Sequence, residues 1–316
     1  MGERCVPFTV LDVDQALPAP LTRATHRYII DAIERTRDYL LTNTGNSLNI
    51  LTATIGDEDV PQSPQRFRET KERISQWLAR SPPRVCFKNV ESVKGFVKGV
   101  VPHFAQFSVE RPGSLSIFLA RSLLSEITRF APAVERPGWV SPIRSQWWIL
   151  LFVLERTLLH ELGHAARFLF GNASTCGREQ HGGGIGREIE SCTGGEALLC
   201  VSDGGVCDLD LTLVVGLGVK TDPEETRYLG LTRGLLLQDF AAVDWASIQE
   251  RVAAMPSSVP ASFRKHHVLK TSDFVPPCSL WSGLEEGMLE IQRQLASPAT
   301  PQFPRSPRLV ASDAKE

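Results

Sequence analysis

The sequence of 316 residues lacks any strong excess of charge of one sign. Its 34 Lys and Arg residues nearly balance 36 Asp and Glu residues, which leaves a formal net charge of -2. Such a chain has no global basic field that would attract nucleic acid or an anionic membrane surface. We therefore expect no nucleic-acid partner and no membrane partner.

Long apolar runs are also missing. The uninterrupted run from Trp147 to Leu154 is much shorter than the roughly 20 residues that a bilayer-spanning helix needs, and Glu155 and Arg156 end it. The N-terminus, MGERCVPFTVLDVD, has neither the basic region nor the apolar run of a secretory signal. These features predict a cytoplasmic protein.

Closely spaced cysteine pairs are absent as well. None of the seven cysteines belongs to a C-x-x-C motif of the kind that binds structural zinc or carries out redox exchange. We expect mostly free, buried thiols. Four of the seven lie between residues 176 and 207, so a disulfide there is the alternative if the protein is exported.

The composition that remains, 42% hydrophobic and 22% charged, is that of an ordinary globular protein, and no internal repeat is found. Apolar spacing, caps and β-branched residues predict a helix–strand order through the first 130 residues. The expected elements are a helix over 21–41, a strand over 47–55, a helix from Pro64 with Ser63 as its N-cap, strands over 84–90 and 114–120, and a helix over 122–130.

The most apolar segment, WWILLFVLERTLLHELGHAARFLF, is expected to form one buried helix. Pro142 suits the first turn, and Gly171-Asn172 suits the C-terminal end. Beyond it we expect a glycine-rich loop, two strand-like runs joined by a hairpin turn at 203–205, and helices over 232–254 and 282–295.

These elements predict an α+β fold that is mostly helical, with a small mixed sheet and one buried active-site helix. Residues 1–140 would form an N-terminal mixed part that holds the sheet, and residues 141–295 the active-site helix and the elements after it. The two parts would make one continuous catalytic domain over 1–295. The proline-rich segment 296–316 is expected to be a disordered tail.

Within the apolar helix stands the sequence His160-Glu161-Leu162-Gly163-His164. Spacing of four residues puts both imidazoles on one helix face, about one turn apart, where they can share one zinc ion. Glu161 is rotated off that face and can take a proton from a metal-bound water. The alternative is a helix that contains these residues by chance, but ionisable groups are rare in apolar helices unless they are paired or bind a metal.

This HELGH segment on a buried helix resembles the active-site helix of the zincin metallopeptidases. The resemblance covers that helix and, at most, the segment after it. It implies a zincin-like fold, a Zn²⁺ cofactor and hydrolysis of peptide or amide bonds, with Glu161 as the catalytic base. Arg167 and Phe170 stand where the metzincin subgroup has a glycine and a third histidine, and no Gly-Thr-x-x-Asp signature follows, so the glutamate-ligand subgroup remains.

In that subgroup the third metal ligand is a Glu some twenty or more residues after the second His. We favour Glu190, which lies 190 − 164 = 26 residues after His164, because Ile189 is expected to pack inward beside it. Glu188 and His181 are the alternatives, and Glu179 and Glu196 are less suitably placed. The chain departs from the family pattern at Gly194, where an Asp would support a histidine.

Tyr228, His266 and His267 are candidates for stabilising the oxyanion of the reaction, although each can equally be a surface or packing residue. The expected partner is a peptide or a small-molecule amide substrate. A metalloenzyme acting on one metabolite or modified peptide is the first alternative. A scaffold in which zinc only staples the helix is the second, and the intact Glu161 disfavours it.

Overall fold

The computed structural model describes residues 5–13, 17–42, 47–55, 63–88, 105–111, 114–135, 142–171, 189, 196–202, 214–220, 226–230 and 266–270. Over these residues the chain is a mixed α+β protein with more residues in helices than in strands. The described strands form a five-stranded mixed sheet and a separate four-stranded sheet. The mixed sheet agrees with the expected fold class, whereas the separate second sheet was not predicted.

The five-stranded sheet has the order β2-β1-β3-β5-β4. Its strands are β1 (Val10–Asp12), β2 (Ala19–Pro20), β3 (Arg84–Lys88), β4 (Ala105–Arg111) and β5 (Ser114–Ala120). Strands β1, β3 and β5 run parallel, and β2 and β4 pair antiparallel at the two edges. The expected strands over 84–90 and 114–120 are thus confirmed as β3 and β5.

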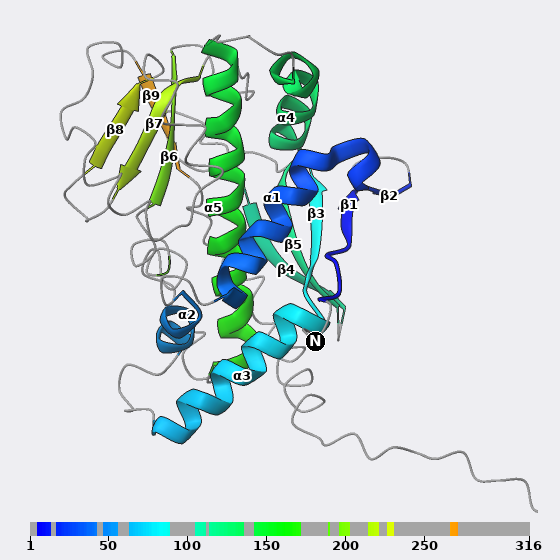
Figure 1. Ribbon diagram of the computed structural model, residues 1–316, viewed down its shortest axis with the longest axis vertical. Helices are drawn as coiled ribbons and strands as arrows, with labels where there is room; N and C mark the ends of the chain where they lie inside the picture. Colours follow the sequence, from blue (N-terminus) through cyan, green and yellow to red (C-terminus); the bar gives the residue numbers. More distant parts are fainter. Residues whose placement is uncertain are drawn as a thin grey trace, which may run out of the picture.

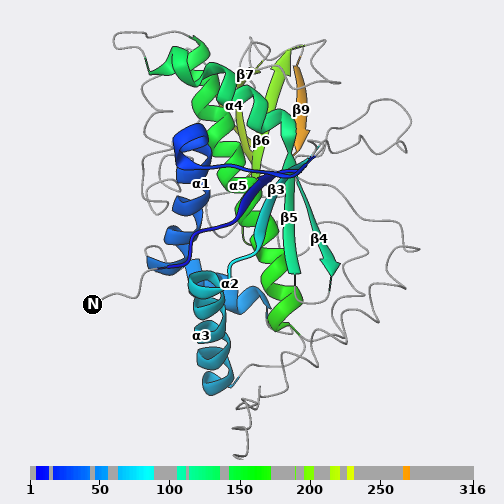
Figure 2. The ribbon, with the colours of Figure 1, turned by 90° about the vertical axis from the view of Figure 1, so that its right-hand side faces the viewer.

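Two helices, α4 (Arg121–Val134) and α5 (Pro142–Phe170), pack against this sheet, and α1 (Arg23–Thr42) packs against both of them. Figure 2 shows α1 and α5 on the same side of it. Ile117 and Leu119 of β5 and Val85 and Phe87 of β3 are fully buried in the cluster that these helices share. The indole Nε1 of Trp147 donates a hydrogen bond of 2.8 Å to the carbonyl of Ile127, which ties α5 to α4.

The four-stranded sheet is antiparallel, with the order β8-β7-β6-β9. Its strands are β6 (Glu196–Ser202), β7 (Val214–Lys220), β8 (Thr226–Gly230) and β9 (His266–Lys270). Strands β6 and β7 confirm the two predicted strand-like runs, while the expected turn at 203–205 lies outside the described residues. This sheet packs against α5 from the side opposite to the first one (Figure 1).

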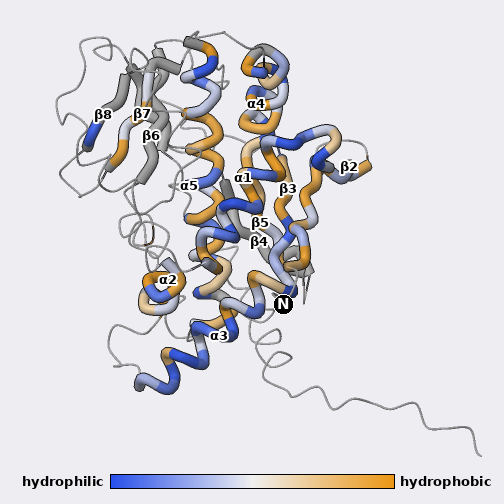
Figure 3. The backbone as a smooth tube through the Cα atoms, viewed as in Figure 1, coloured by the Kyte–Doolittle hydropathy of each residue, from blue (hydrophilic) through white to orange (hydrophobic). Residues whose placement is uncertain are grey.

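Helix α5 is therefore the centre of the molecule and has 29 residues. Its apolar side chains from Ile149 to Leu154 are at most 1% exposed, because both of its sides are covered. In Figure 3 its middle part is mainly hydrophobic, with shorter hydrophilic segments. Its bounds confirm the buried helix expected from the sequence. No helix in the described part of the chain is long and apolar enough to pass through a bilayer.

The strand expected over 47–55 is wrong: this segment is helix α2 (Ser47–Ile55). Leu48, Leu51 and Ile55 are buried, and their spacing of three and four residues is that of a helix face. The hydroxyl of Thr52 donates to the carbonyl of Leu48 at 2.6 Å, one helical turn back. The high content of β-branched residues was misleading, because the burial pattern has period 3.6 and not 2.

Helix α3 (Pro64–Arg80) begins as predicted, because the Ser63 hydroxyl accepts a hydrogen bond of 3.2 Å from the backbone amide of Arg66. The expected helices α1 and α4 are also confirmed. The helices expected over 232–254 and 282–295, the glycine-rich loop and the segment 296–316 lie outside the described residues. Cys5 and Cys86 are thiols in the described part of the chain, and Cys86 is buried.

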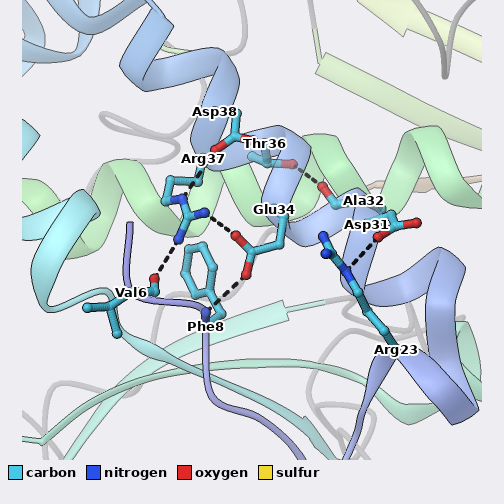
Figure 4. A network of polar contacts seen from close by, with 9 residues as sticks. All are labelled: Val6, Phe8, Arg23, Asp31, Ala32, Glu34, Thr36, Arg37 and Asp38. Carbon is cyan, nitrogen blue, oxygen red and sulfur yellow. Dashed lines mark hydrogen bonds and ion pairs between the residues drawn. The ribbon is translucent and has the colours of Figure 1, made fainter. Parts of the chain in front are cut away.

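A buried ion pair holds the N-terminal segment on α1. Arg37 pairs with Glu34 and donates to the carbonyl of Val6 at 2.6 Å, while the Phe8 amide donates to Glu34 at 3.1 Å (Figure 4). The guanidinium also lies over the Phe8 ring, 5.5 Å from its centroid. This network fixes the chain just before β1, although the sequence pattern gives no sign of it.

Candidate metal centre

The two histidines of the HELGH segment lie in the second half of α5, where their spacing of four residues puts them on one face. His160 is 4% exposed and His164 is partly buried. The surrounding residues of the helix, Leu158, Leu159, Leu162 and Ala165, are fully buried. Two polar rings are thus held side by side within an apolar environment.

The Nε2 atoms of His160 and His164 lie 3.1 Å apart, and their ring centroids 4.9 Å apart. Two nitrogen ligands of a tetrahedral zinc ion, each bonded at about 2.0–2.1 Å, are separated by roughly 3.3 Å. The separation in the structure is close to that value. The pair therefore fits a shared zinc ion, and the same distance also suits a hydrogen bond between two neutral rings.

His164 is neutral at physiological pH. Burial, and to a smaller extent the nearby His160 and Arg167, lower its pKa to about 3. A neutral imidazole keeps the lone pair that a metal ion needs. The environment thus selects the form of His164 that binds zinc.

Glu161 follows His160 directly and is 3% exposed. Its direction differs from that of His160 by about 100° around the helix axis, so it lies beside the imidazole face and not on it. A carboxylate in this position can accept a proton from a group held between the two rings. One turn earlier on the same helix lies Thr157, which is fully buried.

The third ligand is not settled by the described residues. Within them no group of three or more His, Cys, Asp or Glu residues forms that could hold a metal ion. Glu190, Glu188, Glu179 and His181 lie outside the described part, and Glu196 is the first residue of β6. Ile189 is described: it is helical, 1% exposed and part of the same core cluster as α5, as expected for a residue that packs inward.

Strand register separates the candidates for oxyanion stabilisation. Leu217 and Val219 of β7 are buried in the core that includes α5. Tyr228 of β8 pairs with Gly218, which lies between them, so alternation along the strand gives position 228 the opposite face. Tyr228 is therefore not on the face that packs toward α5.

Position 267 of β9 lies on the sheet face opposite to that of position 228 of β8. Leu269 pairs with Leu199 of β6, which in turn pairs with Leu217 on the buried face. His267 lies two residues from Leu269 and shares its face, whereas His266 has the opposite one. Of the three candidates, His267 is the one whose register position shares a face with positions 199 and 217.

One ion pair between α5 and α1, with a buried acid and a partly exposed base, was not predicted from the sequence. Glu155, 2% exposed, accepts hydrogen bonds of 3.1 and 2.5 Å from the guanidinium of Arg35 in α1. Burial raises the pKa of Glu155 to about 7, and the cations Arg35 and Arg156 offset that shift only in part. An isolated acid in an apolar helix was the available signal that a basic partner is needed, but the pattern did not show which helix supplies it.

The chain was compared with known proteins. It matches no protein-family model, no curated protein and no solved structure.

Proposed function

We propose that this protein is a zinc-dependent metallopeptidase with a zincin-like fold, in which His160 and His164 bind the metal and Glu161 is the catalytic base. The observation that carries this proposal is the 3.1 Å separation of the two Nε2 atoms inside an otherwise apolar helix. Helix α5 is held rigidly by contacts with both sheets, which is the kind of support that a precise ligand geometry requires.

Glu190 is proposed as the third ligand, with Glu188 and His181 as alternatives. The burial of Ile189 in the core cluster that includes α5 supports this choice. Three protein ligands leave a fourth position of a tetrahedral site open, as catalysis requires.

When bound, zinc would polarise the scissile carbonyl and increase the acidity of a water molecule. Glu161 accepts the proton of the attacking water and then delivers it to the leaving nitrogen, which is how one carboxylate serves as base and acid in turn. The apolar residues around it exclude bulk water and strengthen its interactions with charged groups. His267 is proposed to stabilise the developing oxyanion, since strand alternation gives position 267 the sheet face that includes the buried Leu217.

An extended peptide is the substrate class that the fold favours. Strand β4 is an edge strand that packs against α5, and among the described strands it pairs only with β5. Its other side offers backbone donors and acceptors to which a peptide can add as a further strand. This would lay the peptide along the sheet edge beside the helix that carries the metal ligands.

The test compares the zinc-loaded wild type with Glu161→Gln on casein and on a mixed peptide library, with cleavage followed by mass spectrometry. We expect peptide cleavage by the wild type and a loss of about 10²–10⁴-fold in Glu161→Gln, since general acid–base catalysis contributes that much. Zinc content should be unchanged, because Glu161 is not a ligand. Glu155→Gln, which changes another buried acid of the same helix, is the matched control and should remain active.

Full activity in Glu161→Gln would contradict the mechanism. A zinc-loaded wild type that cleaves neither casein nor any peptide would contradict the peptidase assignment and leave a metabolite substrate or a zinc-stapled scaffold as the better description.

A further inference from the structure

Thr157 has a buried hydroxyl that the apolar packing of α5 does not explain. The residue is 0% exposed, and its Oγ1 has no hydrogen-bond partner within the part of the chain that the structure describes. A buried hydroxyl without a partner costs free energy, and valine would fill the same space without that cost. A threonine at this position therefore needs a reason.

Two other fully buried threonines show the bond that a helical hydroxyl can make in this protein, whereas the Oγ1 of Thr128 in α4 also has no partner among the described residues. Thr36 donates to the carbonyl of Ala32 at 3.0 Å, and Thr52 donates to the carbonyl of Leu48 at 2.6 Å. Both are 0% exposed, like Thr157. The same bond, to the carbonyl four residues back, is the ordinary choice for a helical threonine, and Thr157 does not make it.

The position of Thr157 on the helix identifies the group that its hydroxyl can serve. Glu161 lies four residues later, so the two side chains share one helix face. Helical side chains lean toward the N-terminus, which brings the carboxylate of Glu161 back over the turn that contains Thr157. A carboxylate only accepts hydrogen bonds, and a hydroxyl can donate one.

We propose that Thr157 is a positioning residue for the catalytic base: its hydroxyl donates a hydrogen bond to the carboxylate of Glu161 during the reaction and fixes the orientation of that group. This inference rests on the proposed function of Glu161. In the resting protein the Thr157 hydroxyl makes no hydrogen bond to the carbonyl four residues back, which costs free energy. In the working enzyme the same hydroxyl orients the base, and this role explains why a threonine is present.

A competing role for Thr157 is support of the metal ligand His160, which lies three residues later and is also a neighbour on the helix. The two roles differ in what they change. Support of His160 would alter zinc affinity, whereas orientation of Glu161 alters the rate of the chemical step and leaves the metal in place.

The experiment uses Thr157→Val, Thr157→Ser and the matched control Thr52→Val in the full chain. Each variant is measured for zinc content, for its unfolding temperature, and for kcat and KM on one casein-derived peptide that the wild type cleaves. We expect Thr157→Val to lower kcat by about 10- to 100-fold, with KM and zinc content unchanged, and Thr157→Ser to recover most of the loss.

Stability provides the second readout. Thr157→Val removes a hydroxyl without a partner and should unfold at the same or a higher temperature than the wild type, while Thr52→Val removes a satisfied hydroxyl and should unfold at a lower one with kcat unchanged. The inference is overturned if Thr157→Val keeps the kcat of the wild type, if it loses zinc, or if Thr157→Ser is no better than Thr157→Val. An inactive wild type would overturn the proposed function and this inference together, whereas an active wild type matched by Thr157→Val overturns the inference alone.

Discussion

The ionisable residues of α5 lie in an apolar helix, and their charge states depend on burial and on nearby charged groups. His164 is kept neutral by burial, with a pKa of about 3, and its Nε2 atom lies 3.1 Å from that of His160. Glu155 is bound by Arg35, yet its pKa is raised to about 7 because burial outweighs the attraction of the cation. A single apolar helix thus contains polar groups whose charge states are set by what covers them.

The raised pKa of Glu155 predicts a dependence of stability on pH. The folded protein holds the proton of Glu155 up to about pH 7, whereas the unfolded chain releases it near 4.5. The free energy of unfolding should therefore decrease as the pH rises from about 4.5 to 7, by roughly 3 kcal/mol from this group. Urea unfolding of the wild type and of Glu155→Gln at several pH values between 4 and 8 measures this contribution.

Because Gln does not titrate, Glu155→Gln should gain stability relative to the wild type across this interval. The ion pair with Arg35 needs the ionised form of Glu155, so the effect of losing it is confined to the upper part of this pH range. Parallel curves for the two proteins would refute the proposed burial of an acid with a raised pKa.

At the scale of single elements, helix α2 adds one buried face to the core. Leu51 is 1% exposed, while its neighbour Ile50 is only partly buried. We predict that Leu51→Ala lowers the free energy of unfolding by about 2–4 kcal/mol and that Ile50→Ala costs less than half as much. Thermal or chemical unfolding distinguishes them, and equal costs would argue against the helical packing.

Elements with strong local signals were predictable, and those whose partners lie far away in the sequence were not. The bounds of α5 follow from Pro142 and Gly171 around an apolar run, and Ser63 marks the start of α3. Strands β8 and β9 carry no clear alternation, and their pairing depends on strands elsewhere in the chain. Strand β4, AQFSVER, does alternate between apolar and polar residues, and this signal was overlooked.

The candidate site divides in the same way. His160, Glu161 and His164 are adjacent in one helix, so sequence spacing alone places them together. The partner of Glu155 comes from α1, and the proposed third metal ligand, Glu190, belongs to a segment beyond α5; such contacts depend on how elements pack. Thr157 was missed because its significance is a hydrogen bond that it does not make, which only coordinates reveal.

At the scale of the whole molecule, α5 lies between two sheets and the N-terminal segment is clamped to α1 (Figures 1 and 4). Arg37→Ala leaves Glu34 buried without its main cation, so we predict a loss of about 3–5 kcal/mol in the free energy of unfolding. Arg23→Ala breaks an exposed pair with Asp31 and should cost less than about 1 kcal/mol. Denaturant titration of both variants tests this, and similar losses would show that the clamp is not a major support.

The central claim is that His160 and His164 hold a zinc ion at the middle of this architecture. Elemental analysis of the purified wild type, His160→Ala, Glu190→Ala and Glu161→Gln, each after zinc loading and desalting, tests it most directly. We predict about one zinc ion per chain in the wild type and in Glu161→Gln, and much less in the two ligand variants. A wild type without stoichiometric zinc, or a His160→Ala variant that keeps it, would contradict the claim.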